Sequence, residues 1–247
     1  MAIYFGSARI GENGKITGGA AGDQKQATTP DIKGEVSIQP FYVHSKGWYI
    51  LRAKSVSGAN ILAERMTKAC NNANIGYDQN QRLGVIANGI DTKALTECDC
   101  SSLVRQCVKE AFFRDPGNFT TATEVSILKK SELFLEKIAF VSLERTPVYD
   151  GDILTTKTSG HTGIIVSGNP RPALSVPLST IKKGAFGENV KNLQKALNIC
   201  GASLDVDGSF GAKTLNALKK WQTTYGLTAD GSYGPKSYQK MRTLLLV

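Results

Sequence analysis

A proline-rich break near residue 170 constrains the fold most strongly, because it divides the 247-residue chain into two unequal parts. Three prolines and two serines lie between Gly168 and Ile181. Proline stiffens the backbone and removes hydrogen-bond donors, so residues 169–181 are predicted to form a linker. The sequence therefore predicts a first domain over residues 1–168 and a smaller second domain over residues 182–247.

The composition permits packed cores and favours an anionic partner. Hydrophobic residues make up 41% of the chain, and the formal net charge is +9. From Lys182 onward there are ten basic and four acidic residues, so most of the excess charge lies in the second domain. A basic surface suits nucleic acid, a polyanionic wall or a membrane surface. Because the chain has no nucleic-acid motif and no run of 18 apolar residues, we expect neither nucleic-acid binding nor membrane insertion.

The N-terminus lacks the basic start and apolar core of a secretory signal. We therefore expect the protein to be made and held in a bacterial cytoplasm until it is released. The five cysteines are an odd number, and without a secretory signal they predict no disulfide framework. Most of them are expected to be buried thiols and one to be reactive. A monomer is assumed.

The first domain reads as α+β, with helices preceding most strands. Residues 1–45 are rich in glycine and predicted to be irregular. Apolar periodicity predicts helices over residues 58–73, 100–112 and 121–131, the last with a capping box of Thr121 and Glu124. It predicts strands over residues 48–51, 134–140, 153–156 and 161–166. This order suggests helices packed on an antiparallel sheet.

Cys100 is the first candidate for a catalytic residue. It opens the amphipathic helix predicted over residues 100–112. The positive end of the helix dipole favours the thiolate, and the free N–H groups there can hold the oxyanion of a tetrahedral intermediate. The competing interpretation is a buried structural cysteine.

A thiolate nucleophile needs a base, and the chain has two histidines. His161 lies in Gly160-His161-Thr162-Gly163, where it opens an apolar strand downstream of Gly151-Asp152-Ile153. His44 lies in the irregular region without a supporting pattern. Two isolated histidines cannot supply a zinc site, so we predict no metal ligand and no cofactor. His161 is the predicted base.

Three motifs together resemble a known family: Asp99-Cys100-Ser101-Ser102-Leu103-Val104, Gly151-Asp152-Ile153 and Gly160-His161-Thr162-Gly163-Ile164. They are similar to the NlpC-type peptidoglycan hydrolases and the related CHAP amidohydrolases. The resemblance covers residues 58 to 167. It implies a papain-like fold, with Cys100 as nucleophile at a helix start and His161 as general base on a neighbouring strand.

The resemblance also implies supporting residues. Tyr77, Asp99 and Ser101 would lie beside the substrate. Asn169 would orient the imidazole as the amide does in Cys-His-Asn enzymes. Ser167 or a residue of the N-terminal segment are alternatives for that role.

The second domain contains an internal repeat. Asp207-Gly208-Ser209-Phe210-Gly211 recurs 23 residues later as Asp230-Gly231-Ser232-Tyr233-Gly234, and a helical pattern follows each copy. With an earlier helix around Val190 and Leu197, these features resemble the peptidoglycan-binding domain type 1 over residues 183–246. The resemblance implies a three-helix domain that binds glycan or stem peptide.

Together the halves predict a peptidoglycan hydrolase of the phage endolysin kind. Its Cys100–His161 pair would cleave an amide bond of the cell-wall stem peptide through a thioester. An endopeptidase is favoured. An N-acetylmuramoyl-L-alanine amidase with the same pair is the alternative, and a non-catalytic wall-binding protein is the second alternative.

Overall fold

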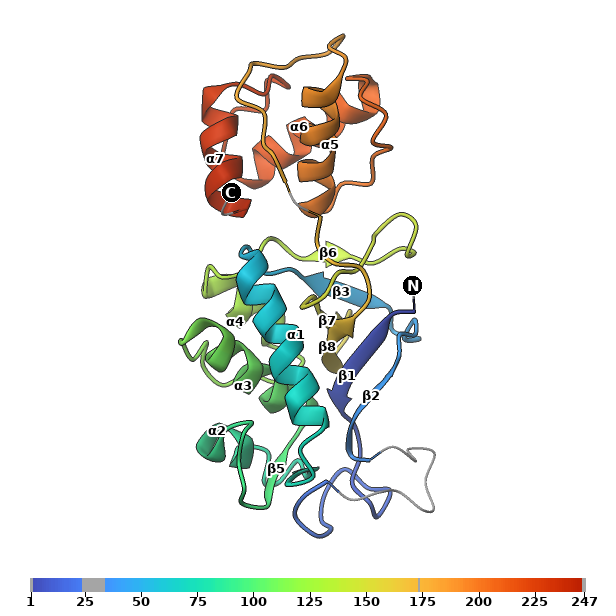
Figure 1. Ribbon diagram of the computed structural model, residues 1–247, viewed down its shortest axis with the longest axis vertical. Helices are drawn as coiled ribbons and strands as arrows, with labels where there is room; N and C mark the ends of the chain where they lie inside the picture. The colour runs from blue at the N-terminus through green and yellow to red at the C-terminus, as the bar shows by residue number, and fades with distance from the viewer. Residues whose placement is uncertain (1, 24–33, 173, 246–247) are drawn as a thin grey trace. The chain divides into compact units, whose positions relative to one another are not determined.

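The computed structural model describes residues 2–23, 34–172 and 174–245, and it divides into two compact units (Figure 1). The first unit holds residues 1–137 and 148–171, and the second holds residues 138–147 and 172–247. The first unit ends inside the predicted linker. The segment 138–147, which the sequence placed in the first domain, groups with the second unit.

The first unit is built on an antiparallel sheet. Its strands lie in the order β2-β1-β8-β7-β3, and each neighbouring pair is antiparallel. The strands are β1 (Tyr4–Ala8), β2 (Val36–Pro40), β3 (Trp48–Leu51), β7 (Ile153–Thr156) and β8 (Thr162–Ser167). A separate parallel pair consists of β4 (Ile75–Tyr77) and β5 (Thr96–Cys98). The predicted mixed α/β class with an antiparallel sheet is confirmed.

Helices cover one face of this sheet (Figure 1). The helices of the first unit are α1 (Val56–Cys70), α2 (Gly84–Asn88), α3 (Cys100–Phe112) and α4 (Glu124–Lys130). α1 and α3 pack on each other and on β1 and β8. Leu62, Met66, Leu103 and Val104 are fully buried between these elements. Burying such side chains stabilises the fold by about 1.5–3 kcal/mol each.

The N-terminal segment differs from its prediction as an irregular region. β1 lies inside the sheet between β2 and β8, where Tyr4–Ala8 pairs with both neighbours. Gly6 explains part of the difference, since a Cβ there would lie 2.6 Å from Met66 of α1. The glycine therefore marks a close approach of helix to strand instead of a turn.

A buried ion pair joins β3 to the start of β7. Arg52 donates to both carboxylate oxygens of Asp152, at 2.9 and 2.7 Å, and both side chains are at most 3% exposed. The Tyr149 N–H also donates to Asp152, at 2.9 Å. Beside it, Gly151 has φ +80° and its Cα faces the Ala59 carbonyl so closely that a Cβ would lie 2.0 Å from the oxygen. The Gly151-Asp152 motif is therefore structural.

The predicted linker is anchored at both ends. Tyr149 and Asn169 form a β-bridge, and the buried Arg171 donates to the Ala53 carbonyl within the first unit. Ile181 forms a β-bridge with Tyr233 within the second unit. Both ends of residues 169–181 thus bond to one of the two units. The segment free to act as a linker is therefore shorter than the predicted range.

The second unit contains the predicted three helices, α5 (Glu188–Ile199), α6 (Ala212–Thr224) and α7 (Pro235–Leu245). The segment that groups with it carries the short β6 (Ile138–Ala139), which is all that forms of the strand predicted over residues 134–140. Phe210, Trp221, Tyr233 and Met241 are buried in its core. The two repeat aromatics therefore serve packing.

Asp152→Ala should destabilise the first unit by about 3–5 kcal/mol, because it leaves the Arg52 guanidinium buried without its counter-ion. Chemical unfolding followed by circular dichroism measures this. Glu64→Ala is the matched control, since it removes an exposed pair with Lys68, whose side chains are 52% and 46% exposed. It should leave the unfolding free energy nearly unchanged, because the pair is hydrated and screened by solvent. Equal losses in the two variants would contradict the assignment.

Candidate active site

Cys100 is the first residue of α3, as predicted, and its neighbours build the helix start. Asp99 is the N-cap in an extended conformation, and its carboxylate accepts the Ser102 N–H at 2.6 Å. In return the Ser102 hydroxyl accepts the Asp99 N–H at 2.9 Å. This reciprocal capping box satisfies two helix donors that would otherwise lack partners. The motif therefore fixes where the helix begins and so where the thiol lies.

Arg82 binds the side chains of both Asp99 and Ser101, and no sequence pattern points to it. Arg82 forms a salt bridge with Asp99 at 2.5 Å and donates to the Ser101 hydroxyl at 2.8 Å and the Phe119 carbonyl at 2.7 Å. Asp99 is 7% exposed and Ser101 2% exposed. This placement gives both residues a supporting role at the helix start, and the substrate contact that the sequence predicted stays a prediction.

The Cys100 thiol is buried and therefore neutral at rest. Burial raises its pKa to about 12, and the nearby Asp99 and Glu124 carboxyls raise it too. Backbone N–H groups of Thr162 and Ser101 donate to the sulfur and act in the opposite direction. The helix start alone predicted a favoured thiolate. That expectation is wrong for the resting site, because desolvation of the charged sulfur outweighs the N–H groups.

His161 comes immediately before Thr162, whose N–H donates to the Cys100 sulfur. Its backbone is fixed against β7, since Thr156 N donates to the His161 carbonyl at 3.0 Å and His161 N donates to the Thr156 hydroxyl at 3.1 Å. Burial lowers the pKa of His161 to about 4, with further lowering from the Arg9 and His44 charges. At neutral pH the imidazole is therefore uncharged and able to accept a proton.

An aromatic cluster surrounds the imidazole. The rings of Phe5 and Trp48 lie 6.0 and 6.3 Å from it, between centroids. Trp48 in turn contacts Tyr42 at 5.8 Å and His44 at 5.3 Å. The structure thus brings both histidines of the chain to one cluster, which the sequence analysis did not foresee for His44. Its members come from β1, β3 and the segment between β2 and β3, and no short motif contains them.

Two tyrosines lie near the thiol. Tyr77 is 4% exposed and pairs in register with Cys98, two positions before Cys100. Burial raises the pKa of the Tyr77 phenol, and charge on Cys100 raises it further. Burial and Cys100 also raise the pKa of Tyr42, against the Arg9 charge. The predicted proximity of Tyr77 to the nucleophile agrees with this geometry, while its contact with substrate stays a prediction.

Asn169 does not lie with the pair. It follows the C-terminal end of β8, whereas His161 precedes the N-terminal end, and a six-residue strand is about 20 Å long. Asn169 is exposed, and its carbonyl accepts the Asp150 N–H. The orienting role predicted for Asn169 is therefore withdrawn, and Ser167 at the same end fails for the same reason. Phe5 of the N-terminal segment packs against the imidazole instead.

A family model described as "Endolysin-like domain" matches residues 5–172, more than half of the chain. The chain belongs to the endolysin-like domain family. A second model, described as "Putative peptidoglycan binding domain", matches residues 186–241. The two matches correspond to the two units described above.

Shorter likenesses relate this endolysin-like protein to wall enzymes. It is 58% identical over 40 residues to a probable N-acetylmuramoyl-L-alanine amidase of Bacillus licheniformis, covering 16% of this chain and 11% of that protein. It is 40% identical over 68 residues to the zinc D-Ala-D-Ala carboxypeptidase of Streptomyces albus G, covering 26% and 27%. A crystal structure of the Burkholderia AP3 phage endolysin is 40% identical over 26% of this chain and 24% of that one, with a TM-score of 0.25. The matches span less than a third of these relatives.

Two general features of the endolysin-like protein complete the site description. Among the described residues, no cluster of three or more His, Cys, Asp or Glu side chains is placed to bind a metal ion. Of the helices in the described ranges, none has the length and apolar character needed to cross a membrane.

Glu124 is a buried residue whose carboxyl lies near the Cys100 thiol. The sequence pattern assigns Glu124 to a capping box with Thr121. No capping box forms there, because Thr121 accepts the Gly160 N–H and Glu124 itself is the first residue of α4. The Thr162 hydroxyl lies 2.8 Å from a Glu124 oxygen and 2.9 Å from the Leu154 carbonyl. A hydroxyl has one proton, and a carbonyl can only accept. Thr162 is the donor to both oxygens, so its one hydroxyl proton is shared between the Glu124 carboxyl and the Leu154 carbonyl.

The electrostatics favour the neutral form of the Glu124 carboxyl at neutral pH. Burial raises the pKa of Glu124 to about 8, against the Thr162 hydrogen bond, which lowers it. A neutral Glu124 binds the Thr162 hydroxyl, and the Thr162 N–H lies against the Cys100 sulfur. Glu124 is thus a positioning residue for the start of β8.

Alkylation of Cys100 by iodoacetamide should accelerate about tenfold per pH unit between pH 7 and 9, because the thiolate fraction rises tenfold per unit below its pKa. Mass spectrometry of the Cys100 peptide measures the rate. A rate that is already constant by pH 7 would instead mean a resting thiolate. Cys98 and Cys107 are fully buried and serve as internal references for unfolding.

Wild-type protein should lose stability relative to Glu124→Gln as pH rises from 5 to 9. A carboxyl with a raised folded-state pKa binds its proton in the folded state and not in the unfolded state between about 4.5 and 8, so the unfolding free energy falls across this range. The glutamine keeps an acceptor for the Thr162 hydroxyl and does not titrate. The difference should be on the order of a few kcal/mol. Thermal melts at each pH measure it, and parallel pH profiles would refute a protonated Glu124.

Proposed function

We propose that this endolysin-like protein is a peptidoglycan hydrolase in which Cys100 is the nucleophile and His161 the general base. The observation that carries the proposal is the contact between the start of β8 and the start of α3, where the residue after His161 donates to the Cys100 sulfur. Membership in the endolysin-like domain family and the match to a peptidoglycan-binding model support it. The papain-like type of the fold belongs to this proposal.

The proposed mechanism begins from two neutral groups. The uncharged His161 takes the proton of the Cys100 thiol as the sulfur attacks the carbonyl carbon of an amide bond. The oxyanion that forms is stabilised by N–H groups at the first turn of α3. The C–N bond then breaks, the amine leaves with the proton from the imidazolium, and a thioester remains. Water, deprotonated by His161, hydrolyses the thioester and releases the acid.

Proton transfer during attack, instead of a preformed ion pair, follows from the pKa shifts. The thiol with a pKa of about 12 and the imidazole with a pKa of about 4 do not exchange a proton at rest. A bound substrate that expels water and places a carbonyl above the sulfur supplies the acceptor for the electron pair. Aromatic rings around His161 keep the imidazole uncharged and in one place.

The substrate bond is proposed to be an amide of the stem peptide, with an endopeptidase favoured. An N-acetylmuramoyl-L-alanine amidase is the second candidate, and the likeness to a probable amidase of that name favours keeping it. Both reactions pass through the same thioester. The basic second unit is proposed to hold the enzyme on the wall, which raises the local concentration of cleavable bonds. A non-catalytic wall-binding role is the remaining alternative.

Cys100→Ala should abolish release of soluble fragments from purified peptidoglycan, and His161→Ala should slow it by about 10²–10⁴-fold, the usual range for loss of general acid–base catalysis. Asn169→Ala, remote from the pair, should leave the rate unchanged. His44→Ala should retain most activity, because His44 is only partly buried and contacts the cluster through Trp48 and Tyr42, with no direct contact to the His161 ring among the described residues. Turbidity loss gives the rate, and mass spectrometry of the fragments identifies the bond.

Three outcomes would contradict this proposal in different ways. Full activity of Cys100→Ala removes the nucleophile assignment. Loss in His44→Ala with activity in His161→Ala means that the other histidine of the cluster is the base. Inactivation by EDTA with resistance to iodoacetamide means metal chemistry, as in the zinc carboxypeptidase relative.

A further inference from the structure

The second unit contains two copies of one polar scaffold. In the first copy the Gln194 amide donates to Asp207 at 2.8 Å and to the Ser209 carbonyl at 3.1 Å. Its oxygen accepts the Gly208 N–H at 2.9 Å, and Asp207 accepts the Ser209 N–H at 2.8 Å. One glutamine thus ties a helix to the Asp-Gly-Ser turn that precedes the next helix.

The second copy repeats every one of these bonds. Gln222 donates to Asp230 at 2.9 Å and to the Ser232 carbonyl at 3.0 Å, and it accepts the Gly231 N–H at 2.9 Å. The copies differ in the loop between glutamine and aspartate, which spans 13 positions in the first and 8 in the second. From the aspartate onward, equivalent residues lie 23 positions apart.

The two copies differ in one charged pair. In the first copy, Lys213 forms a salt bridge of 3.3 Å with Asp205. The equivalent positions in the second copy are Lys236 and Thr228, so the acidic partner is replaced by a hydroxyl. Within the described part of the chain, Lys236 forms no salt bridge. The lysine at this position therefore forms a salt bridge in the first copy, as Lys213, and none with a described residue in the second copy, as Lys236.

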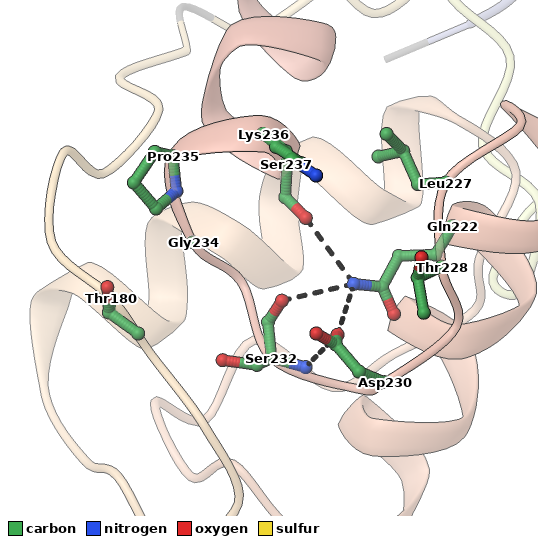
Figure 2. Close-up of a pocket in the computed structure, with 10 residues that line it drawn as sticks. All are labelled: Thr180, Gln222, Leu227, Thr228, Asp230, Ser232, Gly234, Pro235, Lys236 and Ser237. Carbon is green, nitrogen blue, oxygen red and sulfur yellow. Dashed lines mark hydrogen bonds between the residues drawn. The ribbon is translucent and has the colours of Figure 1, made fainter.

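The unpaired lysine borders a pocket of about 530 Å³ (Figure 2). Thr228 and Leu227 line it near Lys236 and Ser237, and Thr180 and Pro235 lie on its other side. The full lining is Thr180, Gln222, Leu227, Thr228, Asp230, Ser232, Gly234, Pro235, Lys236 and Ser237. None of these residues is aromatic, whereas flat aromatic faces are the usual platforms for the apolar face of a sugar ring.

The carboxylate on the pocket wall does not neutralise Lys236. One oxygen of Asp230 accepts the Ser232 N–H and the Gln222 amide, and these bonds lower its pKa, as does the charge of Lys219. Asp207 has equivalent bonds in the first copy. Asp230 is therefore part of the repeated scaffold, and the ammonium of Lys236 remains available to an anionic ligand.

We propose that this pocket binds a carboxylate of a peptidoglycan stem peptide, with Lys236 as its counter-ion. The inference rests on the proposed wall-binding function and names the group that the second unit recognises. Hydroxyls of Thr228 and Ser232 in the pocket lining supply further hydrogen-bond donors, and Leu227 and Pro235 supply apolar contact for a short side chain such as that of alanine. The ligand replaces the intramolecular carboxylate that Asp205 provides in the first copy.

The test uses the full chain carrying Cys100→Ala and sedimentation with insoluble peptidoglycan from which phosphate polymers have been stripped. Lys236→Gln should weaken the Kd by about tenfold, the scale of one charge-assisted hydrogen bond. Lys213→Gln removes the same charge from the equivalent position and should leave the Kd unchanged. Thr228→Asp installs the acid of the first copy and should weaken binding as Lys236→Gln does.

Converting the carboxyls of the peptidoglycan to methylamides should weaken its binding by the Cys100→Ala parent. The parent should then bind no more tightly than the Lys236→Gln variant. Equal losses in Lys236→Gln and Lys213→Gln would mean attraction by net charge and would overturn the inference. An effect of Lys236→Gln seen only on walls that keep their phosphate polymers would overturn it in favour of phosphate. If the parent binds and Lys236→Gln matches it, this inference alone fails. If the parent itself stays in the supernatant, the wall-binding function fails with it.

Discussion

The candidate site depends on the packing of β8 against α3, which brings the backbone N–H of Thr162 to the sulfur of Cys100. This contact joins the start of α3 to the start of β8. The other interactions described for the site each fix one of these two positions. On the helix side, the Asp99–Ser102 capping box and Arg82 fix the first turn of α3. On the strand side, Thr156 and Glu124 fix His161 and Thr162. A shift of either end would separate the proposed nucleophile Cys100 from the proposed base His161.

Local patterns predicted the elements that carry this contact. The helix over residues 100–112 and the strands over residues 48–51 and 153–156 occur with the predicted bounds, because apolar periodicity reports a face that is buried along one element. The placement of Cys100 at a helix start was predictable for the same reason. β1 was missed because the glycine-rich composition of residues 1–45 predicts irregular structure, whereas Gly6 lies within a strand and leaves room for Met66 to pack against it.

The surroundings of the pair were less predictable, because they are assembled from distant segments. Phe5, Tyr42 and Trp48 meet around His161 only when β1 and β3 take their places in the sheet. Asn169 was a reasonable candidate by separation along the chain, but an extended strand carries it away from the histidine. The protonation states also required burial, since a helix terminus favours a thiolate only where water or an ion pair offsets desolvation.

The central position of β1 has a consequence for the order of events during synthesis. Its partner β8 begins more than 150 residues later, so the sheet stays open on that side until nearly all of the first unit has left the ribosome. At about 5–20 residues per second, this takes roughly ten to thirty seconds. Phe5, Cys100 and His161 cannot meet before then. The nascent chain therefore cannot assemble the proposed site until its last strand arrives, and the exposed edge of β1 is the part that needs protection from aggregation meanwhile.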